Sequence, residues 1–223
     1  MKLAVWYHTR LIGGEPPIEP DFSISLMTEQ MATMKRTGLE DSAQDIVICV
    51  NGDSENQVMA RAIAPRKARF IDHGTESKSL LPTVNALREW SLSHQDWLVC
   101  FFHIKGVTHP WDELNTRWRE CMEKCVIKNW RRCVADIESG CDTAGAHWLT
   151  REQYGSHVTF PFWGGQFFWA KASFLAELPA LPNAPTCRQD WFLSENWIGM
   201  GRRPTVKDYA PHWPGIGACG ANR

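Results

Sequence analysis

Three polar residues follow one long apolar run, and their types make them the first candidates for chemistry in this sequence. Residues 97–102 are apolar without alternation, which is typical of a strand that is covered on both faces. His103, Lys105 and Gly106 come directly after this run. The ammonium group of Lys105 can offset the negative charge of a phosphate as a point charge. Because ligands of open α/β sheets bind beyond the carboxyl ends of the strands, we expect the active site here.

A second stretch, residues 160–170, combines aromatic side chains with two consecutive glycines and is expected to form the opposing wall of the site. Gly164 and Gly165 let the backbone approach a ligand because no Cβ stands in the way. Gln166 adds a polar side chain, and Trp163 offers a face on which a sugar can pack. Alternating aromatic residues in a strand usually belong to a core, so we expect one face of this strand to be buried and Trp163 to lie at the site.

The segments around these residues alternate between strand and helix patterns. The sequence predicts strands at 2–7, 45–50, 68–71, 97–102, 142–148 and 167–170, and helices at 22–37, 57–63, 79–93, 111–139, 172–178 and 190–198. This alternation favours an α/β fold with a mostly parallel sheet. The tail after Gly199, which contains several glycines and prolines, is expected to wrap over the surface as a lid or flap.

The composition limits the class of protein. The chain has 223 residues, enough for one large domain with its own core, and a net charge of −1, which gives no general attraction for nucleic acids or anionic membranes. No apolar run approaches the ~20 residues of a membrane span. The apolar start is too short for a signal peptide, so we expect a soluble, cytoplasmic protein.

The eight cysteines show no Cys-x-x-Cys spacing. Cys121 and Cys125 are one helical turn apart, which would allow a zinc site, but a matching second pair is missing. We therefore expect reduced and mostly buried thiols, as is usual inside cells.

The order of these parts resembles the GT-A fold of nucleotide-diphospho-sugar transferases. It resembles more closely the small bacterial and phage glycosyltransferase-like proteins that carry a His-x-Lys-Gly motif. The matching motifs are residues 103–106 followed by Trp111 and Arg117, the Gly-Gly stretch 164–175 followed by Leu178 and Pro179, and residues 195–199. Together they span nearly the whole chain.

This resemblance implies a GT-A-like (Rossmann-like) three-layer sandwich with a mostly parallel central sheet. It implies one domain, residues 1–223. Residues 1–106 would form the nucleotide-binding half, and residues 107–223 the acceptor-binding and catalytic half with a C-terminal flap.

One departure from the family pattern concerns the metal. GT-A enzymes usually carry Asp-x-Asp after the strand that corresponds to 97–102, and these carboxylates hold a divalent cation that neutralises the diphosphate. This chain has His103-Ile104-Lys105 in that register. We expect Lys105, with or without His103, to contact the diphosphate directly. The reaction would then need no metal, or only a weakly held Mn²⁺ or Mg²⁺. A solvated turn lysine is the alternative.

The resemblance also points to a general base. Asp190 and Glu195 lie where inverting GT-A enzymes carry the carboxylate that deprotonates the acceptor hydroxyl. Five positions separate the two residues, so they do not share one helix face and only one is expected to point inward. The motif favours Glu195, with Asp190 second, and an exposed helical carboxylate is the alternative.

The remaining candidates also follow from the family's site. On the donor side they are His8 and Thr9 after the first strand, Asp53 after the second, Arg117 for a bidentate phosphate contact, and the late histidine His212. Asp142 is expected to point toward the site from a later strand. For Arg117 and His212, a solvent-exposed residue without a role is the open alternative.

The sequence therefore predicts a glycosyltransferase that moves a sugar from a nucleotide-diphosphate donor, preferably a UDP-sugar, to an acceptor hydroxyl. The acceptor could be a glycan, a lipid-linked glycan or a modified nucleobase, although the near-neutral charge does not favour a nucleic acid. Two other classes stay open. A non-catalytic nucleotide- or carbohydrate-binding domain would explain the missing Asp-x-Asp. A nucleotidyltransferase would release pyrophosphate, but Gly13-Gly14 is only a weak match to a phosphate loop.

Overall fold

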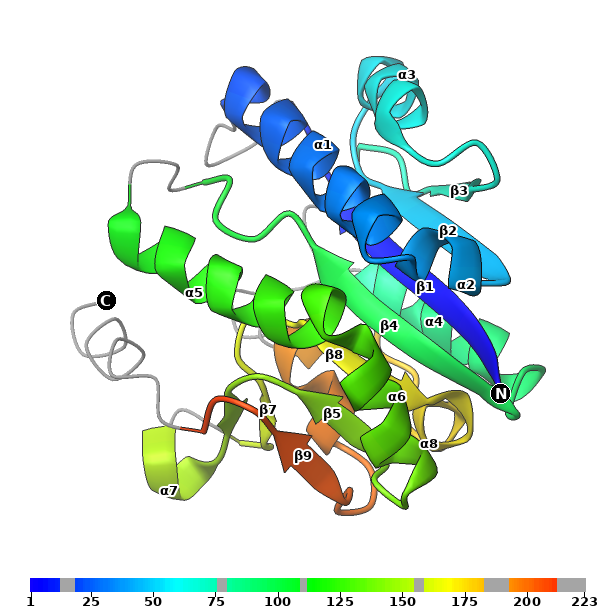
Figure 1. The fold of residues 1–223 in the computed structure, drawn as a ribbon, viewed down its shortest axis with the longest axis vertical. Coiled ribbons are helices and arrows are strands. Elements are labelled where there is room, and N and C mark those ends of the chain that lie inside the picture. Colours follow the sequence, from blue (N-terminus) through cyan, green and yellow to red (C-terminus); the bar gives the residue numbers. More distant parts are fainter. Residues whose placement is uncertain (13–18, 76–79, 109–111, 155–158, 183–192, 212–223) are drawn as a thin grey trace.

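A seven-stranded sheet in the order β3-β2-β1-β4-β8-β5-β9 forms the centre of the fold (Figure 1). The computed structural model describes residues 1–12, 19–75, 80–108, 112–154, 159–182 and 193–211. The strands of this sheet are β1 (Lys2–Thr9), β2 (Asp45–Val50), β3 (Arg69–Asp72), β4 (Trp97–His103), β5 (Thr143–Gly145), β8 (Phe168–Lys171) and β9 (Val206–Asp208). β8 pairs antiparallel with β4 and β5, and the other described pairs in this sheet are parallel. The predicted α/β class with a mostly parallel sheet is confirmed.

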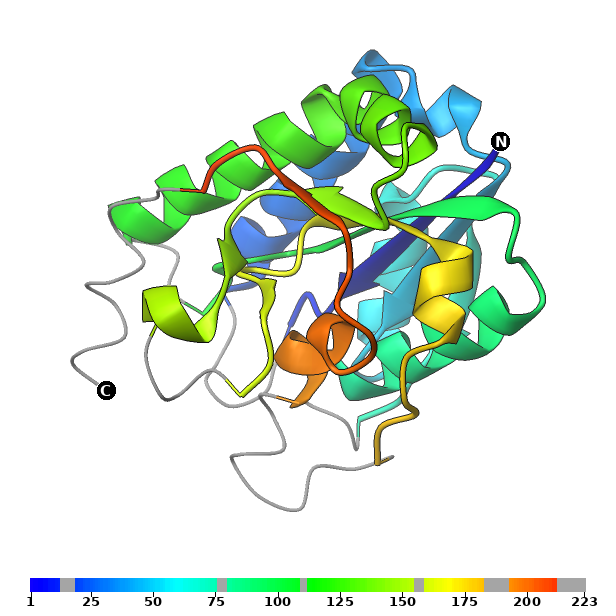
Figure 2. The same ribbon diagram turned by 90° about the horizontal axis from the view of Figure 1, so that it is seen from below.

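Helices cover both faces of the sheet, which gives the three layers expected from the sequence (Figure 2). The described helices are α1 (Pro20–Arg36), α2 (Leu39–Ser42), α3 (Ser54–Ile63), α4 (Leu81–Leu92), α5 (Glu113–Glu123), the π-helical turn η1 (Lys124–Lys128), α6 (Trp130–Glu138), α7 (Arg151–Tyr154), α8 (Ala172–Ala176) and the 3₁₀ turn η2 (Trp197–Gly199). α1, η1 and α6 pack on one face, and α4 and α8 pack on the other. A two-stranded ribbon of β6 (Trp148–Leu149) and β7 (Phe162–Trp163) packs with the second group.

The central strands β1 and β4 are buried on both faces, as their unbroken apolar runs predict. In β1, Val5 and Tyr7 belong to the core on the α1 side, whereas Ala4 and Trp6 belong to the core on the α4 side. Along most of their length these strands therefore have no face open to a ligand. At the carboxyl ends, where the chain leaves the sheet, polar side chains such as His8 and His103 follow the apolar runs.

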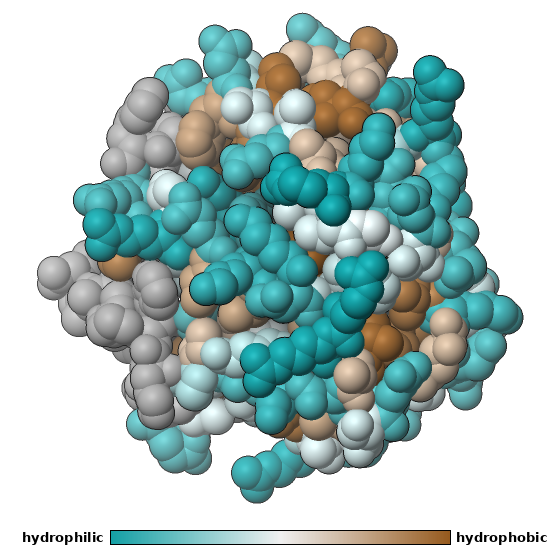
Figure 3. All heavy atoms as spheres, viewed as in Figure 1, coloured by the Kyte–Doolittle hydropathy of each residue, from teal (hydrophilic) through white to brown (hydrophobic). Residues whose placement is uncertain are grey.

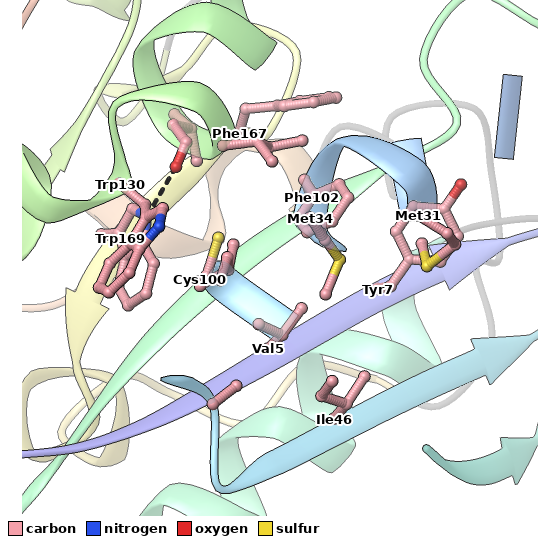
Figure 4. Packing of buried hydrophobic residues seen from close by; sticks show 14 of the residues in the cluster. Val5, Tyr7, Met31, Met34, Ile46, Cys100, Phe102, Trp130, Phe167 and Trp169 are labelled. Atoms are coloured by element: carbon pink, nitrogen blue, oxygen red, sulfur yellow. Dashed lines mark hydrogen bonds between the residues drawn. The ribbon is translucent and has the colours of Figure 1, made fainter. Parts of the chain in front are cut away.

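The core on the α1 side joins segments that are far apart in the sequence (Figure 4). Trp169 of β8 stacks on Trp130 of α6 with ring centroids 6.3 Å apart. The indole Nε1 of Trp169 donates a hydrogen bond of 2.9 Å to the carbonyl oxygen of Val126 in η1. This buried donor is therefore satisfied, which removes the cost of placing an indole N–H in the core.

Two predicted segments differ from the structure. The helix predicted for 111–139 is interrupted, because η1 widens to a π-turn and Asn129, at φ −106° and ψ 29°, leaves helical geometry before α6 begins. The apolar stripe continues through the interruption, so periodicity alone could not locate it. The predicted flap is wrong for Val206–Asp208, which form β9 and pair in parallel with β5 at the edge of the sheet.

The face that carries α1, α5 and α6 is largely hydrophilic, with scattered hydrophobic residues (Figure 3). This is expected for amphipathic helices that turn their polar side to solvent. In the described part of the chain, none of the helices combines the length and the apolar character needed to cross a membrane.

Candidate active site

His103 connects the end of β4 to the Gly-Gly turn, so the two candidate stretches are in contact. Its Nε2 donates a hydrogen bond of 2.8 Å to the carbonyl oxygen of Gly165. Because a carbonyl oxygen only accepts, Nε2 carries the hydrogen, and Nδ1 of a neutral ring keeps its lone pair. His103 is partly exposed, and its ring lies 5.7 Å from that of Phe167.

The Gly-Gly turn depends on glycine for both conformation and space. Gly165 has φ of +85°, and a Cβ there would lie 2.6 Å from Sδ of Met122 in α5. At Gly164 a Cβ would lie 2.9 Å from Cδ1 of Leu149. The sequence predicted that these glycines let the backbone approach a ligand; the close neighbours in the structure belong to the protein itself, and contact with a ligand stays a prediction.

Gln166 attaches the segment that carries Glu195 to this turn. Its Nε2 donates to the carbonyl oxygens of Ser194 and Glu195, the first at 3.2 Å. Residues 193–196 form a single helical turn, which η2 continues. The buried Gln166 amide therefore positions the Glu195 backbone, and no free surface remains on it for a sugar.

Lys105 and Glu195 lie close enough for each charge to influence the other. Burial raises the pKa of the Glu195 carboxyl, and the positive charge of Lys105 opposes this rise. Lys105 Nζ lies 4.6 Å from the ring centroid of Trp118, which is partly exposed and faces the Gly-Gly turn. A carboxyl with a raised pKa beside a cation is an arrangement that is frequent in active sites.

Two histidines stand side by side at this edge of the sheet, because His8 of β1 is the register partner of His103 of β4. Nδ1 of His8 lies 2.8 Å from the hydroxyl oxygen of Thr83 in α4. Burial, followed by the charges of His103, His73 and Arg10, holds the pKa of His8 well below its usual range. Burial and then Lys105 lower the pKa of His103 to about 3. Both rings are neutral near pH 7 and offer hydrogen bonds rather than charge.

Two predicted sugar- or acceptor-binding residues are corrected by the structure. Trp163 is fully buried, and its Nε1 donates to the Thr143 hydroxyl at 2.9 Å, so it is a core residue. Asp142 precedes β5 at the amino edge of the sheet, opposite the carboxyl end of β4. It accepts hydrogen bonds from two nitrogens of Arg202 at 2.7 and 2.9 Å and from the backbone of Thr205. Its role is structural.

Arg119, and not the predicted Arg117, lies beside the turn at Gly106. Arg117 is exposed and pairs with Glu113 one turn earlier in α5. Arg119 is 7% exposed, and its Nη1 would lie 3.6 Å from a Cβ added to Gly106. Arg119 belongs to the i, i+3, i+4 stripe with Met122 and Glu123, and this spacing is the signal that could have identified it.

The other predicted donor residues have local partners or lie outside the described chain. Asp53 is the N-cap of α3, and its carboxylate accepts hydrogen bonds from the backbone and the side chain of Asn56. Thr9 is buried on the α1 side of the sheet. Asp190 and His212, the alternative base and the late histidine, lie outside the described residues.

The described residues do not fit a catalytic Mn²⁺ or Mg²⁺. Among them, no group of three histidine, cysteine, aspartate or glutamate side chains is arranged to hold a metal ion. His103 and Lys105 occupy the register of Asp-x-Asp, and an ammonium group at this point repels a divalent cation.

No protein-family model matches the sequence, and no curated protein matches it either. Three solved structures are among those that resemble this chain over nearly its whole length. HddC from Yersinia pseudotuberculosis has a TM-score of 0.49 and 12% sequence identity, and the match covers 93% of this chain and 90% of HddC. 4-Diphosphocytidyl-2C-methyl-D-erythritol synthase has a TM-score of 0.45 and 10% sequence identity, and the match covers 98% of this chain and 96% of the synthase. CMP:2-keto-3-deoxy-manno-octonic acid synthetase, in complex with CTP, has a TM-score of 0.42 and 10% sequence identity. This match covers 98% of this chain and 95% of the synthetase.

All three TM-scores are below 0.5, so these similarities carry no conclusion about the function of this chain. Its function has to be inferred from its own residues.

Proposed function

We propose that this protein is a glycosyltransferase that moves a sugar from a nucleotide-diphosphate donor to an acceptor hydroxyl. The observation that carries the proposal is that Lys105, just beyond the carboxyl end of β4, lies close enough to the partly exposed Glu195 for its charge to lower the pKa of that carboxyl, against the rise caused by burial. Crevices at this edge of an α/β sheet are the usual ligand sites of such folds. The pair offers a cation for a leaving diphosphate and a base for an attacking hydroxyl.

Lys105 would stabilise the diphosphate that leaves when the sugar is transferred, in the place of a metal ion. Arg119 would add a second positive charge beneath the turn at Gly106. Its guanidinium is 3.7 Å from the carboxylate of Glu123, so part of its charge is already balanced within the protein. Lys105 is therefore the main phosphate ligand in this proposal.

Glu195 would deprotonate the acceptor hydroxyl as it attacks the anomeric carbon. The raised pKa makes its carboxylate a stronger base than an exposed glutamate. His103 Nδ1 and His8 would contribute neutral hydrogen-bonding groups to the donor. Trp118, next to Lys105 and Gly165, takes the role of the aromatic sugar platform that was predicted for Trp163.

Thermal shift with UDP, GDP, TDP, CMP and their sugars, each with Mn²⁺ or with EDTA, tests donor binding. A ligand that binds the folded state raises the melting temperature. We expect a nucleotide-selective rise that survives EDTA and is lost in Lys105→Ala. The affinity loss should be about tenfold or more, the usual value of a charged hydrogen bond. Arg117→Ala is the matched control and should bind normally. Normal binding by Lys105→Ala would remove Lys105 from the site.

Transfer is tested with the donor that gives the largest shift and a panel of hydroxyl acceptors. Glu195→Gln should bind the donor as well as the wild type does and lose most of the transfer or donor hydrolysis. Unchanged turnover would exclude Glu195 as the base. The missing Asp-x-Asp favours one second candidate, a non-catalytic nucleotide- or carbohydrate-binding domain. Binding without any turnover by the wild type would support that candidate.

A further inference from the structure

The guanidinium of Arg119 is buried, although its hydrogen-bond donors are not used by the described residues. Arg119 is 7% exposed, and its contact with the Glu123 carboxylate, at 3.7 Å, is longer than a hydrogen bond. Nε is fully enclosed and has no hydrogen-bond partner in the described part of the chain. Nη1 and Nη2 make no hydrogen bond to the described residues either, but they are not enclosed in this way and keep contact with solvent. Since buried charges are usually both paired and hydrogen-bonded, this guanidinium has donors left for a ligand.

The guanidinium lies beside the turn that follows β4. A Cβ added to Gly106 would lie 3.6 Å from Nη1 of Arg119, so the backbone of this turn passes close to the charged group. Lys105 precedes Gly106, and its Nζ lies 4.6 Å from the ring centroid of Trp118, the residue before Arg119 in α5. Two positive side chains, one from the turn and one from α5, are therefore next to the carboxyl end of β4.

Glu123 is the counter-ion of Arg119, and a buried chain of hydrogen bonds holds it in place. Its Oε1 accepts a hydrogen bond of 2.8 Å from Nε2 of Gln30 in α1. Oε1 of Gln30 accepts one of 2.7 Å from the hydroxyl of Tyr7 in β1. All three side chains are buried. The carboxylate is thus fixed by partners other than Arg119, and it reduces the positive charge of the guanidinium without a hydrogen bond to it.

We propose that Arg119 binds a phosphoryl group of the donor diphosphate through Nη1 and Nη2, and that Glu123 is an internal counter-ion that weakens this contact. The inference rests on the proposed function for the identity of the anion. A guanidinium offers a phosphate two parallel donors, whereas the ammonium of Lys105 acts as a point charge. The carboxylate of Glu123, within 4 Å of the guanidinium, repels a second anion that approaches the same group.

The counter-ion acts only while Glu123 is ionised. Burial raises the pKa of its carboxyl, and the charge of Glu29 in α1 adds to the rise. The amide hydrogen bond from α1, the charge of Arg119 and that of Lys128 in η1 oppose it. The hydroxyl of Tyr7 adds no charge, because burial raises its pKa well above the usual value. Glu123 becomes neutral as the pH falls through its raised pKa, so Arg119 should bind an anion more tightly below that pH than above it.

Pyrophosphate serves as the probe for the diphosphate, and calorimetric titration of the full-length protein at pH 7.5 and constant ionic strength measures its affinity. Arg119→Met should weaken binding about tenfold or more, the usual value of charged hydrogen bonds. Glu123→Gln should tighten binding about threefold or more, because the opposing charge is removed and the side-chain volume is kept. An ion pair with a structural role alone gives no tightening. Unchanged or weaker binding by Glu123→Gln, or no binding by the wild type, would overturn the proposal.

Arg117→Met and Glu113→Gln are the matched controls for these two variants. The two control residues form an exposed ion pair on the same helix, so both variants should bind pyrophosphate as the wild type does. If Arg119→Met does not fold, the direction of the change in Glu123→Gln decides the question.

The ratio of the pyrophosphate affinities of Glu123→Gln and the wild type, measured at several pH values, isolates the charge of Glu123. Protonation of the probe and of Glu195 affects both proteins and cancels in this ratio. The ratio should approach one as the pH falls through the pKa of Glu123. A ratio above one that does not change with pH would contradict the role of Glu123 as a counter-ion.

The same variants, titrated with the nucleotides and nucleotide sugars of the thermal-shift panel, separate this inference from the proposed function. If nucleotide binding depends on Lys105 but is unchanged in Arg119→Met and Glu123→Gln, the proposed function stands and the inference fails. If pyrophosphate binding changes as expected but no nucleotide sugar is bound or transferred, the anion site stands and the proposed function fails.

Discussion

At the scale of single residues, the site depends on one carboxyl and one ammonium group that affect each other. Burial disfavours the charged form of Glu195, whereas the neighbouring charge of Lys105 favours it. The two effects set the pH at which Glu195 loses its proton. In the proposed mechanism Glu195 has to be ionised to accept a proton from the acceptor hydroxyl, so we predict that turnover falls as the pH drops through the pKa of Glu195.

Lys105→Met removes the favourable charge while leaving the burial in place. We therefore predict that the pKa of Glu195 rises further in this variant, since only the raising cause remains. NMR titration of the glutamate carboxyl carbons in the ligand-free protein measures this shift directly. Lys124→Met is the matched control, because Lys124 is an exposed lysine at the start of η1. An unchanged Glu195 titration in Lys105→Met would show that the two groups do not interact.

Single residues were also where sequence patterns were least informative. The apolar run before His103 identified the correct strand end, because burial on both faces leaves a clear signal. Trp163 and Arg117 were assigned by type and motif position, and their side chains point elsewhere. Which of two nearby arginines or tryptophans faces a site depends on packing between helix and sheet, which no local pattern contains.

At the scale of elements, the segment that carries Glu195 is positioned by a close backbone contact. A Cβ added to Gly199, at the end of η2, would lie 1.9 Å from the carbonyl oxygen of Pro161, just before β7. Backbone atoms cannot rotate away as the end of a side chain can. Glycine is required at this position for space, and η2 together with the Gln166 hydrogen bonds fixes Glu195.

Gly199→Ala should therefore lower the free energy of unfolding by about 3 kcal/mol, the upper range for overpacking. It should also reduce turnover, because η2 must move away from β7. Gly74→Ala is the control, since Gly74 has φ of +64° and no atom within 4 Å of an added Cβ. That variant should lose only about 1 kcal/mol from the left-handed conformation. Urea unfolding measures the free energy of unfolding of both variants. An equal decrease in Gly199→Ala and Gly74→Ala would contradict the steric explanation.

At the scale of the whole molecule, the first half of the fold could be predicted better than the second. β1, β2 and β4 have long apolar runs, and the parallel pairing of β1 with β2 and β4 follows from the strand–helix alternation. In the second half, β5, β6, β7 and β9 are two or three residues long, too short for a periodic signal. β9 forms because tertiary contacts hold the 202–208 segment against β5, and the sequence pattern of Gly199 and its neighbours suggested only a flap.

The contact that attaches β9 to the sheet should make the stability of the protein depend on pH. The hydrogen bonds from Arg202 lower the pKa of Asp142, and the backbone of Thr205 adds to this effect. The folded pKa lies below the unfolded value of 3.8, so in the pH range around and below 3.8 the folded state binds fewer protons than the unfolded state does. This contribution to stability is fully present above about pH 3.8 and is lost as the pH falls through the folded pKa.

Asp142→Asn should lower the free energy of unfolding by about 1–2 kcal/mol at pH 7. The estimate is at the low end for charged hydrogen bonds, because Arg202 is 48% exposed and solvent screens the pair. The difference from the wild type should shrink as the pH falls below the unfolded pKa of 3.8 and through the lower folded pKa, because the carboxylate that accepts these hydrogen bonds is then lost. Urea unfolding at several pH values measures this, with Glu177→Gln as the control. Glu177 is an exposed partner of the same arginine, so its loss should change stability by less than about 0.5 kcal/mol. If the difference in unfolding free energy between Asp142→Asn and the wild type stays constant down to pH 3, packing and not charge holds β9 in place.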